Sequence, residues 1–337
     1  MSDISLHKPV IGISLGDING IGPEVVMKAL SDVRMLEMIT PVIYGSTKVL
    51  GYYRKALKLN NFQYQHMDNG PQQAHVNVVN CWEELIEITT GQATPDGGRA
   101  ALLALQHAVR DLKAGVIEGI VTAPINKHNI QTEEFQFPGH TEYFTKEFET
   151  KDSLMLLCSG NLRVGVVTGH VPLAKVPQLI TRERVQHKLN ILERTLKQDF
   201  GINKPRIAVL GLNPHAGEDG LLGTEEQEVI IPLIEDFKNK GKLVFGPFPA
   251  DGFFGNDAYN KFDGILAMYH DQGLIPFKTL AFELGVNYTA GLPIVRTSPD
   301  HGTAYDIAGQ NIASEASFRE AIYLACDIAR RRKEKEN

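Results

Sequence analysis

Three histidines each follow an apolar segment that has the character of a buried β-strand. RVGVVTGH ends at His170, RIAVLGLNPH ends at His215 and GILAMYH ends at His270. Ligands of open α/β sheets bind beyond the carboxyl ends of the strands, so we expect these imidazoles to converge although they are far apart in the sequence. Three imidazoles form a catalytic metal site that leaves positions open for water or substrate. Zn²⁺, Mg²⁺ and Co²⁺ are the candidate ions.

Acidic side chains lie close to this histidine set in the sequence. Asp271 directly follows His270, and Asp251 lies in the Gly- and Pro-rich segment GPFPADGFFG. A carboxylate beside a metal site can orient an imidazole or accept a proton from the substrate. The candidates for the catalytic base are therefore Asp251 and Asp271, with Lys278 as a third, and the sequence leaves the choice open.

Basic and polar residues form a second group, which suits an anionic substrate. FPGHTEYF places His140 and Thr141 at the expected start of a helix, where free N–H groups favour a negative ligand. Lys278 lies eight residues after His270, and Arg296 lies at the expected end of a strand. Cations near a metal site predict a substrate that carries phosphate or carboxylate.

Short apolar segments alternate with longer amphipathic segments along the chain. This alternation predicts an α/β fold with largely parallel strands. At 337 residues the chain is long enough for about two domains. The clearest predicted strands are 10–15, 41–46, 115–124 and the segments before the three histidines, and the clearest predicted helices are 22–30, 97–115, one within 176–201, 224–241 and 314–332.

Charge and cysteine content exclude several classes of protein. The net charge of −6 argues against general nucleic-acid binding, which requires a basic surface. The three cysteines are far apart and form neither a disulfide framework nor a CxxC metal pair. No segment has the length and apolarity of a membrane span, and MSDISLHKPV lacks the apolar core of a signal peptide. We therefore expect a cytoplasmic protein without nucleic-acid or membrane partners.

Six motifs occur in order across nearly the whole chain: GDINGIGPEVV, TAPINK, FPGHTEYF, LNPHAGEDG, MYHDQG and RTSPDHGTAYDIAG. Together they resemble the 4-hydroxythreonine-4-phosphate dehydrogenase family of pyridoxal phosphate biosynthesis. The resemblance implies two α/β/α domains with a cleft between them, as in isocitrate and isopropylmalate dehydrogenases, and a homodimer with an active site shared between subunits. It implies a discontinuous cofactor-side domain, 1–125 with 285–337, and a metal-, substrate- and dimer-forming domain, 126–284.

The resemblance also assigns roles to individual residues. The family's metal ligands fall on His170, His215 and His270, and one ligand can come from the partner subunit. Its substrate contacts fall on His140, Thr141, Lys278, Asn287 and Arg296. The loop from His301 to Gly309 would hold the adenosine end of NAD or NADP, with contacts at Asp17, Gly20, His301, Gly302, Thr303 and Asp306. The stretch IASEAS follows this loop where the distant dehydrogenases have Asn-Pro, so the choice between NAD and NADP stays open.

The reaction implied by the resemblance is a metal-dependent oxidative decarboxylation. NAD(P)⁺ would oxidise 4-phosphooxy-L-threonine to 3-amino-2-oxopropyl phosphate and carbon dioxide. Threonate or erythronate 4-phosphate is an alternative substrate within the broader family. Three histidines with an open position would also suit a metal-dependent hydrolase, and two α/β domains would suit a binding protein without catalysis. The long loop at 296–309 favours the dehydrogenase over both.

Overall fold

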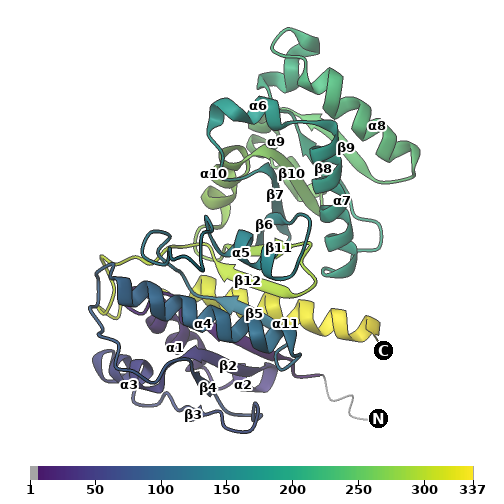
Figure 1. The fold of residues 1–337 in the computed structure, drawn as a ribbon. Helices are drawn as coiled ribbons and strands as arrows, with labels where there is room; N and C mark the ends of the chain where they lie inside the picture. Colours follow the sequence, from purple (N-terminus) through teal and green to yellow (C-terminus); the bar gives the residue numbers. More distant parts are fainter. Residues whose placement is uncertain (1–6, 337) are drawn as a thin grey trace, which may run out of the picture. The chain divides into compact units, whose positions relative to one another are not determined.

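The computed structural model describes residues 7–336, and the chain divides into two compact units. Unit 1 comprises Met1–Glu149 and Leu292–Asn337, and unit 2 comprises Thr150–Gly291. The N-terminal unit is therefore discontinuous. Each unit is an α/β structure in which helices cover a β-sheet, and this confirms the predicted fold class (Figure 1).

The boundaries differ from the expected 125/126 and 284/285 for identifiable reasons. Segment 126–149 belongs to unit 1, because Gln106 Nε2 donates to Glu134 Oε2 at 2.8 Å and Lys113 Nζ donates to Glu147 Oε2 at 2.8 Å. Segment 285–291 belongs to unit 2, because its strand pairs antiparallel with the strand at Leu154–Ser159.

All the strand pairs within unit 1 are parallel, in the order β3-β4-β2-β1-β5-β12. The strands are β1 (Val10–Ser14), β2 (Thr40–Gly45), β3 (Gln65–His66), β4 (Asn77–Asn80), β5 (Gly119–Thr122) and β12 (Val295–Pro299). β1, β2 and β5 are almost completely buried, which is typical of parallel strands covered by helices on both faces.

The helices of unit 1 cover both faces of this sheet. They are α1 (Gly22–Leu30), α2 (Met35–Met38), α3 (Thr47–Ala56), α4 (Pro95–Lys113), α5 (His140–Glu147) and α11 (Ala316–Glu336). α4 packs on β1, β2 and β5, whereas α11 packs on β5 and β12 and also contacts α1 (Figure 1). α4 begins where Thr94 accepts a hydrogen bond from Gly97 N, so the predicted helix 97–115 starts two residues earlier, at Pro95.

Unit 2 has the strand order β11-β6-β7-β10-β8-β9. Its strands are β6 (Leu154–Ser159), β7 (Leu162–Thr168), β8 (Ile207–Leu210), β9 (Val244–Phe248), β10 (Gly264–Tyr269) and β11 (Val286–Ala290). β6 is antiparallel to β7 and β11, whereas β10 is parallel to β7 and to β8. The carboxyl ends of β7, β10 and β8 therefore lie at the same edge of the sheet.

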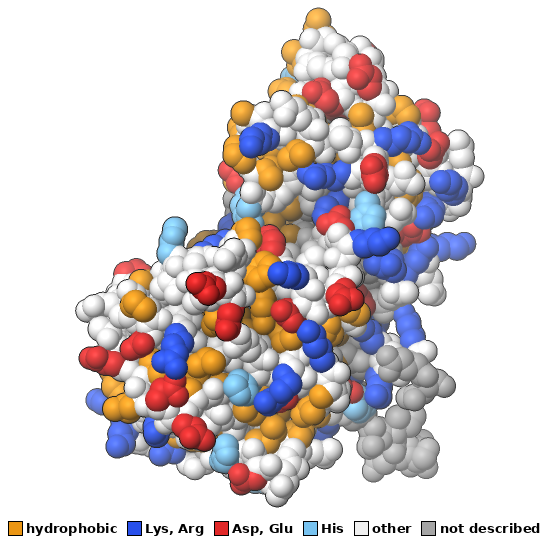
Figure 2. Space-filling view, in the orientation of Figure 1, with side chains coloured by type: hydrophobic (Ala, Val, Ile, Leu, Met, Phe, Trp, Pro, Cys, Tyr) orange, Lys and Arg blue, Asp and Glu red, His pale blue; other side chains and the backbone are white. Residues whose placement is uncertain are grey.

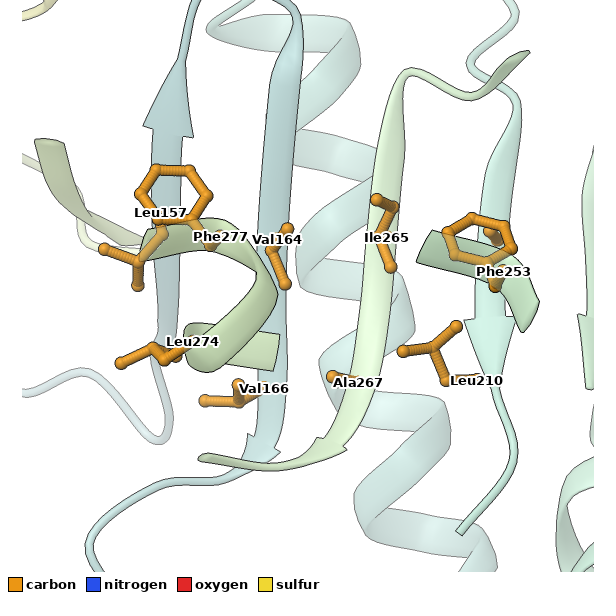
Figure 3. Packing of buried hydrophobic residues seen from close by; sticks show 10 residues of the cluster. Leu157, Val164, Val166, Leu210, Phe253, Ile265, Ala267, Leu274 and Phe277 are labelled. Carbon is orange, nitrogen blue, oxygen red and sulfur yellow. The ribbon is translucent and has the colours of Figure 1, made fainter. Parts of the chain in front are cut away.

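The helices of unit 2 are α6 (Val176–Leu179), α7 (Arg182–Gln198), α8 (Ile231–Asn239), α9 (Ala250–Gly255) and α10 (His270–Ala281). α9 and α10 pack on one face of this sheet, α7 covers the other face, and α8 packs on β9. Figure 3 shows Leu274 and Phe277 of α10 and Phe253 of α9 on apolar side chains of β6, β7, β8 and β10, with α7 behind the strands. This cluster fixes the register of the strands that precede the three histidines.

Of the two long helices predicted in unit 2, one is regular and one starts irregularly. The helix expected within 176–201 is α7, which begins where Thr181 accepts a hydrogen bond from Arg184 N, just after the short helix α6. The helix expected at 224–241 starts with a π-helical segment, Glu226–Ile230, and continues as α8. A π-helical segment often occurs near a functional site.

The surface carries mixed charge. Lys and Arg side chains are interspersed with Asp and Glu over the face seen in Figure 2. Within residues 7–336, no helix combines the length and apolarity that crossing a membrane requires.

Candidate functional site

His170 and His270 lie side by side at the ends of two neighbouring parallel strands. β7 ends at Thr168, two residues before His170, and His270 is the first residue of α10, directly after β10. The centroids of the two imidazole rings are 5.7 Å apart. The pairing of β7 with β10 therefore brings together two of the three predicted metal ligands.

Asp271 holds the His270 ring in a defined orientation. The distance between His270 Nδ1 and Asp271 Oδ1 is 2.7 Å. A proton on Nδ1 that is donated to this carboxylate leaves the Nε2 lone pair available as a metal ligand. Asp271 thus contacts the imidazole, as expected for an orienting acid.

A cavity of about 530 Å³ adjoins the two imidazoles. It is lined by residues 169–171 and 269–271 together with Leu173 and Val176. Its volume lies within the range of small-molecule sites, and its lining combines apolar side chains with a few polar groups, as such sites do.

His215 occupies an unusual left-handed turn. It follows β8 by five residues and opens a run, from His215 to Asp219, in which every φ is positive, between 43° and 87°. The left-handed conformation costs roughly 1–2 kcal/mol for each residue other than glycine, and only Gly217 in this run is a glycine. Residues held in such conformations cluster at functional sites.

The structure does not bring His215 together with the paired histidines. Within residues 7–336, no three His, Cys, Asp or Glu side chains are grouped so that they could hold a metal ion. The imidazole of His215 is exposed on its turn. The chain by itself therefore presents a pair of imidazoles, and the predicted third ligand lies elsewhere in the same unit.

The remaining predicted residues of unit 2 lie on α9, α10 and β11. Asp251 is exposed in the first turn of α9, and Lys278 is half-buried on α10, two turns after His270. Asn287 lies on β11 opposite Leu157 of β6, and its buried Oδ1 atom has no hydrogen-bond partner in the chain. A buried acceptor without a partner is costly, so a ligand donor is the expected partner of Asn287.

A basic cluster lies in unit 1 around Arg296. This arginine lies on β12, is 2% exposed, and donates through Nη2 to Thr122 Oγ1 at 2.6 Å. Burial lowers the pKa of Arg296 to about 9, and Glu142 opposes this effect only in part. An anion bound here would offset the cost of burying the guanidinium charge.

His140 belongs to the same basic cluster. Burial is the main reason that its pKa is lowered well below the ordinary 6.5, and the charges of Arg296 and Lys127 act in the same direction. Its Nε2 atom is buried and has no hydrogen-bond partner in the chain. The neutral ring is thus available to hydrogen-bond a ligand.

The predicted helix start at His140 is confirmed, because α5 begins at that residue. Thr141 follows in the first turn, and its carbonyl accepts a hydrogen bond from Thr145 Oγ1 at 2.7 Å. Free N–H groups of this first turn add to the preference of the cluster for an anion.

The glycine-rich turn after β1 contacts the loop after β12. Ile21 N donates to Thr303 O at 2.9 Å, and a Cβ atom at Gly20 would lie 2.7 Å from the same oxygen. Tyr305 OH donates to Asp17 Oδ2 at 2.7 Å. Asp17 and Gly20 thus lie beside the loop that was expected to hold the cofactor.

Asp17 is a buried structural acceptor. It is 0% exposed, and its carboxylate also accepts from Asn19 N at 2.9 Å and from Asn129 Nδ2 at 2.7 Å. Burial, reinforced by the hydrogen bond to Asp17, raises the pKa of Tyr305 above its ordinary value, so the phenol remains a donor. Asp17 therefore acts on the loop through Tyr305.

Other residues of the predicted cofactor loop remain accessible. Gly302 and Asp306 are exposed, and His301 is half-buried with Nδ1 3.1 Å from Gly302 O. A Cβ atom at Gly302 would meet no atom within 4 Å, so this position is open to a ligand.

Sequence reasoning missed four residues that the structure places in these clusters: Thr122, Lys127, Asn129 and Tyr305. The first three lie within or just beyond the TAPINK motif, which connects β5 to the basic cluster and to Asp17. Their proximity to this motif was the available signal, but pairing with the distant residues Arg296 and Asp17 could not be derived from local sequence.

Paired imidazoles beside a cavity, with a separate buried basic cluster, are typical of an α/β enzyme that acts on an anionic small molecule. The profile of the family described as pyridoxal phosphate biosynthetic protein PdxA matches residues 37–325. A 4-hydroxythreonine-4-phosphate dehydrogenase from Bacteroides thetaiotaomicron is 55% identical over 328 residues, which cover 97% of this chain and 90% of the relative. The chain therefore belongs to the PdxA family.

Two further comparisons agree with this assignment. The crystal structure of 4-hydroxythreonine-4-phosphate dehydrogenase from Klebsiella pneumoniae matches with a TM-score of 0.82 and 34% identity, covering 98% of this chain and all (100%) of the other. A protein from Oceanobacillus iheyensis, provisionally named D-threonate 4-phosphate dehydrogenase, is 41% identical over 96% of this chain and 98% of the relative.

Replacing Tyr305 by Phe tests the contact between the glycine-rich turn and the loop. The variant removes one donor from the buried Asp17 carboxylate, so the free energy of unfolding should fall by about 2 kcal/mol. The measurement is chemical denaturation. Tyr52→Phe is the matched control, because that hydroxyl is exposed and 3.4 Å from Thr90 Oγ1. Equal losses in both variants would contradict a special role for the Asp17 contact.

His140 predicts a specific dependence of stability on pH. Its pKa is lowered in the fold, so the unfolded chain binds the proton first as the pH falls. The stabilisation by neutral His140 is complete above pH 6.5 and decreases below it. His140→Gln should therefore lose less stability than the wild type between pH 7 and pH 5, whereas His75→Gln, at an exposed position, should follow the wild type. Parallel curves for all three proteins would refute the prediction.

Proposed function

We propose that this protein oxidises 4-phosphooxy-L-threonine with NAD(P)⁺ and releases carbon dioxide, yielding 3-amino-2-oxopropyl phosphate. The observation that carries the proposal is the His170–His270 pair beside a cavity of about 530 Å³, in a chain of the PdxA family. The buried basic cluster of unit 1 supports it, because the substrate carries both a phosphate and a carboxylate.

The substrate anions are assigned to groups that the fold already holds in place. In unit 1, the buried Arg296 lies close enough to His140 to affect the pKa of that imidazole, as does Lys127. A charged guanidinium and a neutral imidazole donor together suit a phosphate or a carboxylate. In unit 2, Lys278 and Asn287 are assigned to the substrate as well. The buried Oδ1 atom of Asn287 has no hydrogen-bond partner in the chain, so it suits a donor such as the substrate amine.

The imidazoles of unit 2 fit a divalent metal ion. Two adjacent rings, one of them oriented by a carboxylate, provide nitrogen donors of the kind that Zn²⁺ and Co²⁺ prefer. Mg²⁺, which prefers oxygen ligands, is the alternative. When bound, such an ion lowers the pKa of a substrate hydroxyl and polarises the ketone that forms from it. His170 and His270 would hold it, with His215 as the third ligand.

We place His215 of this site on the second subunit of a homodimer. The motivation is that, among residues 7–336, no group of three potential ligands forms within one chain. Unit 2 also exposes large apolar side chains at Leu173, Leu221, Ile275 and Phe282, which are between 63% and 80% exposed. Leu173 lines the cavity beside His170, so a partner that covers these side chains would approach the site.

The nicotinamide cofactor is assigned to unit 1. The loop from His301 to Gly309 is held against the glycine-rich turn and leaves Gly302 and Asp306 accessible. The cofactor would contact this loop at His301, Gly302, Thr303 and Asp306. Asp17 and Gly20 contact the same loop at Tyr305 and Thr303. When bound, NAD or NADP accepts the hydride from the substrate carbon.

Three residues of unit 2 are candidates for the catalytic base. Asp271 is 2.7 Å from His270 and is assigned to orienting that ring. Lys278, on the same helix, and Asp251, at the start of α9, are the candidates to accept the hydroxyl proton. Free, buried cysteines at positions 81, 158 and 326 suit a reducing compartment, and we place the reaction in the cytoplasm.

A second candidate function is the oxidation of D-threonate 4-phosphate, the substrate in the name of the Oceanobacillus iheyensis relative. This compound has a hydroxyl where 4-phosphooxy-L-threonine has an amine. Turnover of both compounds, and of erythronate 4-phosphate, should be followed as NADH and NADPH formation. The substrate with the highest kcat/KM identifies the function.

His270→Ala tests the metal role. The variant should lose bound divalent ion, measured by elemental analysis, and kcat/KM should fall at least about a hundredfold. His187→Ala replaces an exposed histidine of α7 in the same unit and should leave both unchanged. A His270→Ala protein that retains metal and turnover would exclude the site.

A further inference from the structure

Glu226 is a buried carboxylate next to the turn that carries His215. Glu226 is only 1% exposed and is the first residue of the π-helical segment Glu226–Ile230. Burying a carboxylate is unfavourable unless hydrogen bonds compensate for the lost water. The identity of its partners therefore indicates what Glu226 does.

The carboxylate binds the chain directly before the left-handed turn. Leu212 N donates to Glu226 Oε1 at 2.6 Å, and Asn213 N donates to the same oxygen at 2.8 Å. Asn213 Nδ2 donates to Oε2 at 2.9 Å. These groups lie two and three residues before His215, so Glu226 fixes the direction in which the chain enters the turn.

The turn also encloses the carboxylate from the other side. A Cβ atom at Gly217 would lie 2.8 Å from Glu226 Oε2, and one at Gly211 would lie 3.1 Å from Oε1. The carboxylate thus lies between two glycines that flank His215. Gly217 has a φ of +87°, so this position has both the conformation and the space that favour glycine.

The turn also forms backbone hydrogen bonds of its own. Ala216 N donates to Asn213 O at 3.1 Å, and Leu222 N donates to Gly217 O at 3.1 Å. Four of its five positions from His215 to Asp219 are non-glycine residues in the left-handed region. A conformation that these residues do not favour must be maintained by the surrounding structure.

We propose that Glu226 is a positioning residue for His215: its buried carboxylate maintains the left-handed turn that presents this imidazole to the metal site. The inference rests on the proposed metal role of His215. Glu226 itself contacts neither substrate nor metal, and it acts through the backbone of Leu212 and Asn213. Glu226 begins the π-helical segment, and its carboxylate lies next to Gly211 and Gly217 of the loop that carries His215.

The test compares Glu226→Ala and Glu226→Gln with Glu228→Gln, an exposed position in the same segment. Hydrogen exchange is measured for the amides of residues 211–222, and Co²⁺ affinity is measured by calorimetry on the intact protein. Glu226→Ala should accelerate exchange in 211–222 while leaving β10 protected, and should weaken Co²⁺ binding roughly 10–100-fold. Glu226→Gln retains an acceptor for Leu212 N and Asn213 N, so it should lie closer to the wild type.

A double-mutant cycle separates positioning from a general loss of structure. If Glu226 acts through His215, Glu226→Ala should cause no further loss of Co²⁺ affinity in the His215→Ala background. A further loss of the same size in that background, or unchanged exchange in 211–222, would overturn the proposal. Should the wild type bind no divalent ion while Glu226→Ala still loosens 211–222, the metal role of His215 is wrong and only the structural part of the inference remains. Should Glu226→Ala fail to fold, the comparison of Glu226→Gln with Glu228→Gln decides.

Discussion

The parallel pairing of β10 with both β7 and β8 is the constraint on which the candidate metal site depends. All three strands end at one edge of the sheet, so the residues that follow them emerge at that edge. The apolar cluster beneath α9 and α10 fixes this register, because a shift by one residue would turn Val164, Ile265 and their neighbours to the opposite face (Figure 3). His170 and His270 are paired as a consequence, a hundred residues apart in sequence.

Unit 1 shows the same dependence of chemistry on strand pairing. β5 and β12 are parallel, with Arg296 opposite Ile120 and Thr297 opposite Val121. This register brings Thr122 close enough to accept from the buried guanidinium of Arg296. The burial that makes the guanidinium charge of Arg296 unfavourable in the free protein would also strengthen its attraction for a bound anion, because the local dielectric constant is low.

The sequence predicted the strand ends but not the path of the chain beyond them. The apolar segments before His170 and His270 gave correct strands, because buried parallel strands are continuous apolar runs. His215 differs, since five residues separate it from β8 and the backbone then turns left-handed. NPHAGEDG contains two glycines, which indicates a turn but not a run of positive φ in His, Ala, Glu and Asp. Which side the imidazole faces could therefore not be predicted.

The contacts that support the sites were the least predictable. TEEQEVIIPL has the pattern of an ordinary amphipathic helix, and nothing local marks Glu226 as the buried member of its acidic run. Asp17 and Tyr305 are 288 positions apart, and their hydrogen bond follows from the discontinuous unit 1. The boundaries of the two compact units differ from the expected domain boundaries for the same reason. Long-range contacts of segments 126–149 and 285–291 decide to which unit each segment belongs.

The most direct test of the central claim, a metal site completed by the partner subunit's His215, is complementation in mixed dimers. Heterodimers of His170→Ala with His215→Ala should regain up to about half of the wild-type NAD(P)H formation, because one of two shared sites is intact. Heterodimers of His170→Ala with His270→Ala should stay inactive, because neither chain has both paired imidazoles. An inactive first heterodimer, formed from chains that are separately folded and dimeric, would show that His170 and His215 act within one chain and would contradict the account.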